Sequence, residues 1–144
     1  MGWTHYWERL TELPKAEFAE GVQDILRLSK ACPVGISGFE GCGEPIFEPE
    51  HVVFNGTSPQ HYEPFEVSRI EFDRRGRTVI LSYCKTDRKP YDLFVQAALI
   101  VFKHHLGEAF QVSSDTDDSA WLSARSFVSE SLGYGDLFDL DEKQ

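Results

Sequence analysis

The sequence PYDLFVQAALIVFKHH, residues 90–105, has the pattern of a helix that is buried on nearly all sides. Pro90 suits the first position of a helix, and Gly107 suits the residue just after its C-terminal end. Between them, the apolar residues surround most of the helix axis and do not form a single stripe. Such a helix lies in the interior of a fold, so we expect it to be the central helix of the protein.

The segments on either side of this helix predict strands and two further helices. Residues 38–50 (GFEGCGEPIFEPE) contain many glycines and prolines and predict an irregular loop. Elsewhere, alternating or β-branched apolar residues predict strands, and apolar residues at helical spacing predict helices. The expected strands are residues 2–9, 34–37, 51–55, 66–72, 78–84 and 109–114, and the expected helices are 14–30 and a last one from Asp117, Asp118 or Ser119 to Gly133.

The clearest predicted pairing is an antiparallel hairpin formed by residues 66–72 (EVSRIEF) and 78–84 (TVILSYC). Apolar and polar side chains alternate in both segments, and residues 73–77 (DRRGR) have the composition of a turn. The order β-α-β-β-β-β-α-β-α then predicts an α+β fold, with a mainly antiparallel sheet of about five or six strands and two or three helices packed on one face. The other sheet face stays open, where a protein partner or a second copy of the chain could bind as a homodimer.

Length and composition fit one domain. The chain has 144 residues, of which 41% are hydrophobic and 26% charged, as is typical of globular proteins. We expect residues 1–135 to form a single α+β domain and residues 136–144 to form an acidic C-terminal tail, either free or docked. The first residues lack the basic start and apolar core of a signal peptide, and no apolar run is long enough to span a bilayer. A cytoplasmic location without a membrane partner is therefore expected.

The three cysteines, Cys32, Cys42 and Cys84, show no CxxC pair and no zinc-finger spacing to histidine. We expect free thiols in a reducing compartment, with no metal site and no cofactor.

The charge of the chain is strongly acidic but uneven. The net charge is −10, with 11 acidic and 4 basic residues in 1–68 and 9 acidic and 2 basic residues in 108–144. Residues 69–89 reverse this balance, with 7 basic and 3 acidic residues. A surface that is acidic over most of its area repels duplex nucleic acid and favours a basic protein partner.

Residues 84–92 (CKTDRKPYD) form the densest group of polar residues that could carry a function. They join a predicted strand to the central helix, and the start of a helix attracts anions. Lys85, Thr86, Arg88 and Lys89 are therefore candidate ligands for a nucleotide or a phosphorylated metabolite, with enzymatic turnover left open. The alternative is that Thr86 or Asp87 only caps the helix while the charges face water.

Four segments resemble a family of small proteins of bacteria and their phages to which no activity is assigned. The segments are GWTHYW at residues 2–7, VVFNG at 52–56, CKTDRKPYD at 84–92 and VSSD at 112–115. The resemblance covers most of the chain and implies one intact domain, but no catalytic residue.

These observations favour a non-enzymatic, acidic binding or accessory protein that engages a basic protein partner. The comparison with immunity and anti-defence proteins is one of class only. Large aromatic residues dominate many protein interfaces, so Trp3, Tyr6, Trp7 and Trp121 are candidate anchors if they are exposed. Burial in the core is the alternative for each of them.

Overall fold

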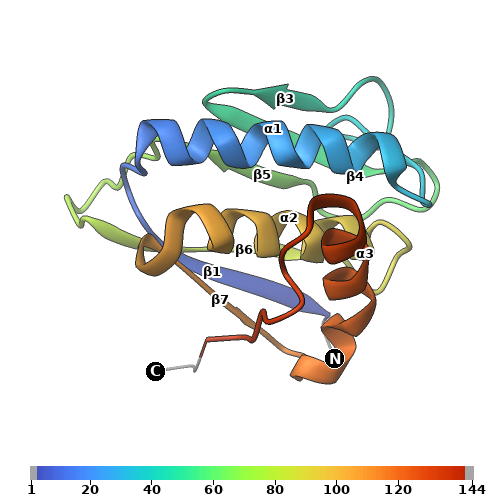
Figure 1. Ribbon diagram of the computed structural model, residues 1–144. Helices are drawn as coiled ribbons and strands as arrows, with labels where there is room; N and C mark the ends of the chain where they lie inside the picture. Colours follow the sequence, from blue (N-terminus) through green and yellow to red (C-terminus); the bar gives the residue numbers. More distant parts are fainter. Residues whose placement is uncertain (1–2, 142–144) are drawn as a thin grey trace.

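In the computed structural model, which describes residues 3–141, three helices cover one side of two small antiparallel sheets (Figure 1). The elements in chain order are β1 (Thr4–Leu10), α1 (Lys15–Ala31), β2 (Ile36–Ser37), β3 (Ile46–Glu48), β4 (His51–Gly56), β5 (Phe65–Ser68), β6 (Val79–Lys85), α2 (Asp92–Leu106), the 3₁₀ turn η1 (Gly107–Ala109), β7 (Phe110–Ser114), the 3₁₀ turn η2 (Asp118–Trp121) and α3 (Leu122–Leu132). The predicted α+β class is confirmed. The last α-helix begins at Leu122, after η2, and not at the predicted caps.

The strands form two hydrogen-bonded sheets in place of one continuous sheet. One has the order β6-β1-β7, and in the other β4 pairs with β2, β3 and β5. The short strand β3 lies within the predicted loop 38–50, where Ile46 pairs with Val53 of β4. A strand of three residues between two prolines carries no alternation long enough to be recognised.

Helix α2 is the central helix, as predicted. All residues from Phe94 to Phe102 are buried, and Gly107 ends the helix with a φ of 58°. Figure 1 shows α1 and α2 side by side over the strands. Gly21 allows this close approach, because a Cβ at this position would lie 3.2 Å from the ring of Phe102. The close packing explains a glycine inside α1.

The predicted hairpin of residues 66–72 and 78–84 is wrong in its pairing. Strand β5 pairs with β4, and β6 pairs with β1. The predicted turn does form, since the Arg77 amide donates to the Asp73 carboxylate at 2.7 Å. Residues 69–71 leave the hairpin, however, because Leu13 N donates to Arg69 O and Glu71 N donates to Thr11 O. These bonds to the segment after β1 keep the two arms apart.

The part of the predicted tail that the structure describes is docked. Phe138 is buried against Trp121, and Asp141 N donates to Val112 O on β7. Met1, Gly2 and residues 142–144 lie outside the described residues. None of the helices among residues 3–141 is long and apolar enough to cross a membrane.

Candidate functional site

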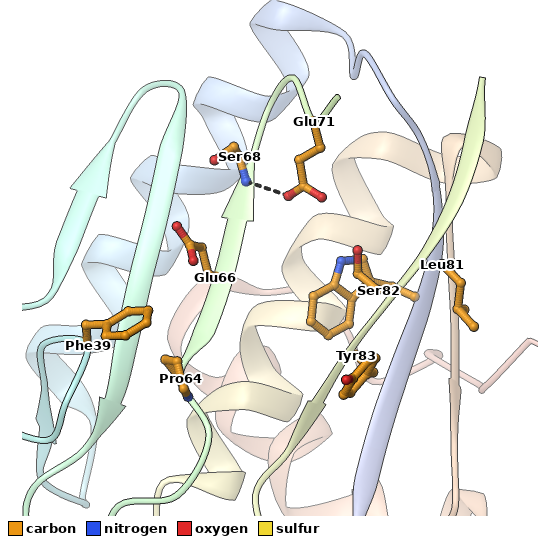
Figure 2. Close-up of a pocket in the computed structure, with 9 residues that line it drawn as sticks. Phe39, Pro64, Glu66, Ser68, Glu71, Leu81, Ser82 and Tyr83 are labelled. Atoms are coloured by element: carbon orange, nitrogen blue, oxygen red, sulfur yellow. Dashed lines mark hydrogen bonds between the residues drawn. The ribbon is translucent and has the colours of Figure 1, made fainter. Parts of the chain in front are cut away.

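A groove opens where the predicted hairpin fails to pair, and we call it the β5–β6 groove. It holds about 530 Å³ and lies between the two unpaired strand edges (Figure 2). Figure 2 shows Glu66 and Ser68 on one strand and Leu81 and Tyr83 on the other, on opposite sides of this space. The residues that line it are Trp7, Phe39, Pro64, Glu66, Ser68, Glu71, Leu81, Ser82 and Tyr83.

Hydrogen bonds close the groove at both ends. At one end, Glu63 N donates to Lys85 O, and Lys85 N donates to the Glu63 carboxylate at 2.8 Å. At the other end, the buried guanidinium of Arg9 donates to Ser68 O at 2.6 Å and pairs with Glu71 at 3.0 Å. Burial lowers the pKa of Arg9, and the Glu71 carboxylate opposes this effect. The opening between β5 and β6 is thus a fixed feature of the fold.

The strand edges that face the groove carry unpaired backbone groups. Thr86 N donates to Trp3 O and Thr11 N donates to Thr78 O, so in β6 the even-numbered residues bond to β1. In an antiparallel ladder the N–H and C=O of alternate residues point to opposite sides, so those of Leu81 and Tyr83 point into the groove. Within residues 3–141, the structure gives these groups no hydrogen-bond partner.

Strand β5 presents its edge in the same way. Arg69 N donates to Glu50 O, which directs the backbone bonds of the odd-numbered residues toward β4. The N–H and C=O of Glu66 therefore point toward β6. Both borders of the groove thus offer backbone donors and acceptors to whatever lies between them.

The floor of the groove is the indole of Trp7. This side chain is 1% exposed, and its ring packs 5.2 Å from Phe65 and 6.3 Å from Phe110, measured between centroids. Its Nε1 is buried and has no hydrogen-bond partner among the described residues. A buried donor without a partner costs about 1–3 kcal/mol, so it needs an explanation.

The sheet face next to the groove is apolar and carries acidic residues. Leu81 and Tyr83 are each 62% exposed, although they lie in the middle of a strand. On β1, Glu8 lies opposite Leu81, and Tyr6 lies opposite Tyr83. The helices pack on the other side of these strands, so this face is the helix-free face of the protein (Figure 1).

Most side chains of the predicted anion site contact other residues of the protein. Thr86 is buried, and its hydroxyl donates to the Asp92 carboxylate at 2.6 Å. Arg88 lies over the ring of Trp3 at 4.6 Å, while Lys85 lies over the ring of Tyr62 at 5.7 Å. The cations of Lys85 and Arg88 therefore lie over different aromatic rings and do not converge on one anion.

The start of α2 also has few donors left for an anion. Asp92 N donates to Lys89 O, Leu93 N to Pro90 O and Phe94 N to Tyr91 O. The Asp92 carboxylate itself sits in the first turn, where it meets the positive end of the helix dipole. Lys89 is half-buried beside this turn. Neither Thr86 nor Asp87 caps α2, because its N-cap residue is Tyr91 and no described side chain bonds to its first amides. The capping alternative is therefore wrong, and the anion site stays a prediction.

Cys84 has the properties of a core thiol. It is buried, and its Sγ lies 3.5 Å from Glu63 O. Burial and the nearby Glu63 carboxylate raise the pKa of Cys84 well above its ordinary value. A thiol held in its protonated form is a poor nucleophile.

A buried polar network, which sequence reasoning missed, ties β1, β7 and α2 together. His5 is fully buried, its Nε2 lies 2.7 Å from Asp92 Oδ1, and its Nδ1 lies 2.7 Å from Ser114 Oγ. Trp121 Nε1 donates to Thr116, whose hydroxyl lies 2.9 Å from Ser114 Oγ. The only sequence signal was the polar residues inside strands of otherwise apolar pattern.

This network contains serine, histidine and aspartate but does not form a hydrolase site. One ring nitrogen of His5 pairs with Asp92 and the other with Ser114, so both ring nitrogens are satisfied within the fold. Ser114 Oγ also accepts from Thr116 N at 3.1 Å. Since both His5 and Ser114 are buried, no substrate can reach the hydroxyl.

The four candidate anchors divide into two pairs. Trp3 and Tyr6 are half-buried at the surface, and the Tyr6 hydroxyl donates to Asp115 at 3.0 Å. Trp7 and Trp121 lie in the core, which corrects the expectation that they could be surface anchors. Trp7 nevertheless borders the groove from below.

Among the residues that the structure describes, no three histidine, cysteine, aspartate or glutamate side chains gather so that they could hold a metal ion. Comparisons of the chain with protein-family models, with curated proteins and with solved structures find no match. The family resemblance therefore stays a prediction, and the function has to be argued from the groove and its surroundings.

Proposed function

We propose that this protein is a non-enzymatic binding protein that engages a basic protein partner through its helix-free face. In this proposal it masks a basic surface of the partner, which is how immunity and anti-defence proteins act as a class. The observation that carries the proposal is the groove between β5 and β6, with its unpaired strand edges and exposed apolar border.

The exposed side chains on this face support a protein ligand. Leu81 and Tyr83 are 62% exposed on adjacent outward positions of β6. Exposed apolar groups that gather next to a groove often mark an interaction site, whereas single ones need no explanation. Tyrosine is also among the residues that contribute most to binding energy at interfaces.

The charge of the chain supports a basic partner over a second copy of this chain. The net charge of −10 repels another copy and attracts a basic protein. Glu8 and Glu66 are exposed on the helix-free face, where they can meet the partner's cations. Complementary charge raises the association rate and makes that rate fall with salt.

Affinity capture tests this proposal. The immobilised protein is incubated with extract of the cells in which it occurs, beside a Leu81→Asp, Tyr83→Asp double variant. The matched control changes two exposed leucines on the helices, Leu26→Asp and Leu122→Asp. We expect a basic protein that wild type and the control retain, and that the double variant loses at least tenfold, about 1.4 kcal/mol.

Two results would contradict the proposal, provided that circular dichroism shows all three proteins folded. One is that the folded wild type retains no protein. The other is that the partner binds the double variant as well as the control, which would place the interface elsewhere.

A further inference from the structure

We propose that the β5–β6 groove binds an extended segment of the partner, which adds as a strand beside β6 and in which Lys or Arg alternates with small residues. This inference rests on the proposed function and specifies the chemistry of the partner. It follows from three features of the groove: its free backbone groups, the unpaired indole of its floor and the side chains on its rim.

The free backbone groups set the shape of the ligand. Leu81 and Tyr83 are two residues apart on β6 and point their N–H and C=O into the groove. The next extended strand of a sheet is the ligand that pairs with such a row of groups. A segment of about four residues spans roughly 13 Å, enough to pair with both positions.

The Trp7 indole supplies a separate reason to expect a backbone in the groove. Its Nε1 is buried, lacks a partner among the described residues and belongs to a side chain that lines the groove. An indole N–H can only donate, so its missing partner is an acceptor. In this proposal the Trp7 ring turns slightly so that Nε1 reaches the groove, where a carbonyl of the inserted segment accepts its hydrogen bond and offsets the cost of the unpaired donor.

The side chains on the rim set the sequence of the ligand. Along a strand, successive side chains point to opposite faces, so every second residue of the segment faces the Trp7 ring and the others face outward. The inward positions need small side chains, because the groove has a volume of about 530 Å³ and a bulky floor. The outward positions lie between Glu66 on one border and Leu81 and Tyr83 on the other.

Lysine and arginine fit this outward position. Their aliphatic part can lie on Leu81 and Tyr83 while the cation reaches Glu66. The Glu66 side chain is 48% exposed and lies 2.9 Å from His51 Nε2. Glu71 is already paired with Arg9 and contributes less charge. Charge complementarity therefore selects a basic segment over an acidic one.

The experiment titrates the ¹⁵N-labelled protein with a seven-residue peptide, acetylated and amidated, in which Lys and Ala alternate. A peptide with Glu in place of Lys serves as the charge control. The chain has three tryptophans, and Trp121 Nε1, already bonded to Thr116, provides an internal reference. We expect the Trp7 indole proton to move downfield and saturate with the Lys peptide only, while the Trp121 signal stays in place.

Two variants at one position separate backbone pairing from side-chain contact. Leu81→Ala removes the apolar side chain but keeps the N–H that faces the groove, and Leu81→Pro removes both. Proline is tolerated at this position because residue 81 makes no ladder bond to β1. We expect the Kd for the Lys peptide to rise about tenfold more for Leu81→Pro than for Leu81→Ala.

Each other outcome overturns the inference. No saturable movement of the Trp7 signal, or equal Kd values for two folded variants, would show that no strand pairs with β6. A dimer in sedimentation that Leu81→Pro dissolves would assign the groove to a second copy of the chain. If the captured partner still depends on Leu81 and Tyr83 in such a case, the proposed function stands and only the mode of binding fails.

Discussion

The start of α2 and the β5–β6 groove use their polar groups in opposite ways. At the start of α2, the Asp92 carboxylate accepts hydrogen bonds from His5, Thr86, Trp3 and Gln96. In the groove, the Trp7 indole N–H and the backbone groups of Glu66, Leu81 and Tyr83 have no partner among the described residues. The segment that is richest in polar residues is thus satisfied internally, and the open site lies where an apolar, alternating segment fails to pair.

The difference shows that a dense polar motif is not by itself a binding site. Donors and acceptors that satisfy one another stabilise the fold and have little left to offer a ligand. Groups that the fold leaves unsatisfied, in a place that a ligand can reach, are the better sign of function. Three predictions test this difference between the two regions.

The largest effect is expected at Asp92. Replacing it in Asp92→Ala leaves the donors of His5, Thr86, Trp3 and Gln96 buried or half-buried without their acceptor. Breaking a buried, charged hydrogen-bond centre costs about 3–5 kcal/mol of the free energy of unfolding. Urea denaturation followed by circular dichroism measures this loss.

Asp139→Ala is the control for this change, because Asp139 is also an exposed aspartate and its backbone is not left-handed. A surface change of this kind alters stability by about 0.5 kcal/mol or less. Similar losses for both variants would mean that the network around Asp92 does not stabilise the fold.

A smaller effect is expected when the two buried tryptophans are compared. Trp7→Phe and Trp121→Phe remove the same ring atoms from sites that are 1% and 0% exposed. Trp121→Phe also breaks the bond from Nε1 to Thr116, whereas Trp7→Phe removes a donor that has no partner among the described residues. We therefore expect Trp121→Phe to be the more destabilising by about 1 kcal/mol, measured by urea denaturation.

An equal loss for the two tryptophan variants would show that the Trp7 indole has a partner in solution. That result would count against a ligand carbonyl as the acceptor for Trp7 Nε1. A larger loss for Trp7→Phe would do so more strongly.

The sequence identified the secondary structure better than the pairing of the strands. The buried helix at residues 90–105 and most strands could be predicted, because their apolar spacing is local. The hairpin prediction failed because the Arg9 side chain and the segment after β1 bind residues 68–71, over about 60 positions along the chain. Contacts at such a separation leave no local pattern, so neither the groove nor its Trp7 floor could be found from the sequence.

The predicted anion site behaves in a similar way. The sequence correctly indicates a polar connection between a strand and a helix. It does not indicate which residues these polar groups bond to. Asp92 lies six positions after Thr86 and 87 positions after His5, so the carboxylate at the centre of the network could not be assigned from spacing alone.

The smallest effect is expected from anions added to the intact protein. Since the amides and Thr86 at the start of α2 already have partners, phosphate, nucleotides and sugar phosphates should not change the melting temperature. A ligand at 100 times its Kd would add about 2.7 kcal/mol of stability, a shift of several degrees that a thermal-shift assay detects easily. A shift that Arg88→Ala and Lys89→Ala abolish, and that Arg74→Ala in the exposed turn does not, would overturn this expectation. It would mean that the network at the start of α2 opens to accept a ligand, and that a site with satisfied groups can still bind.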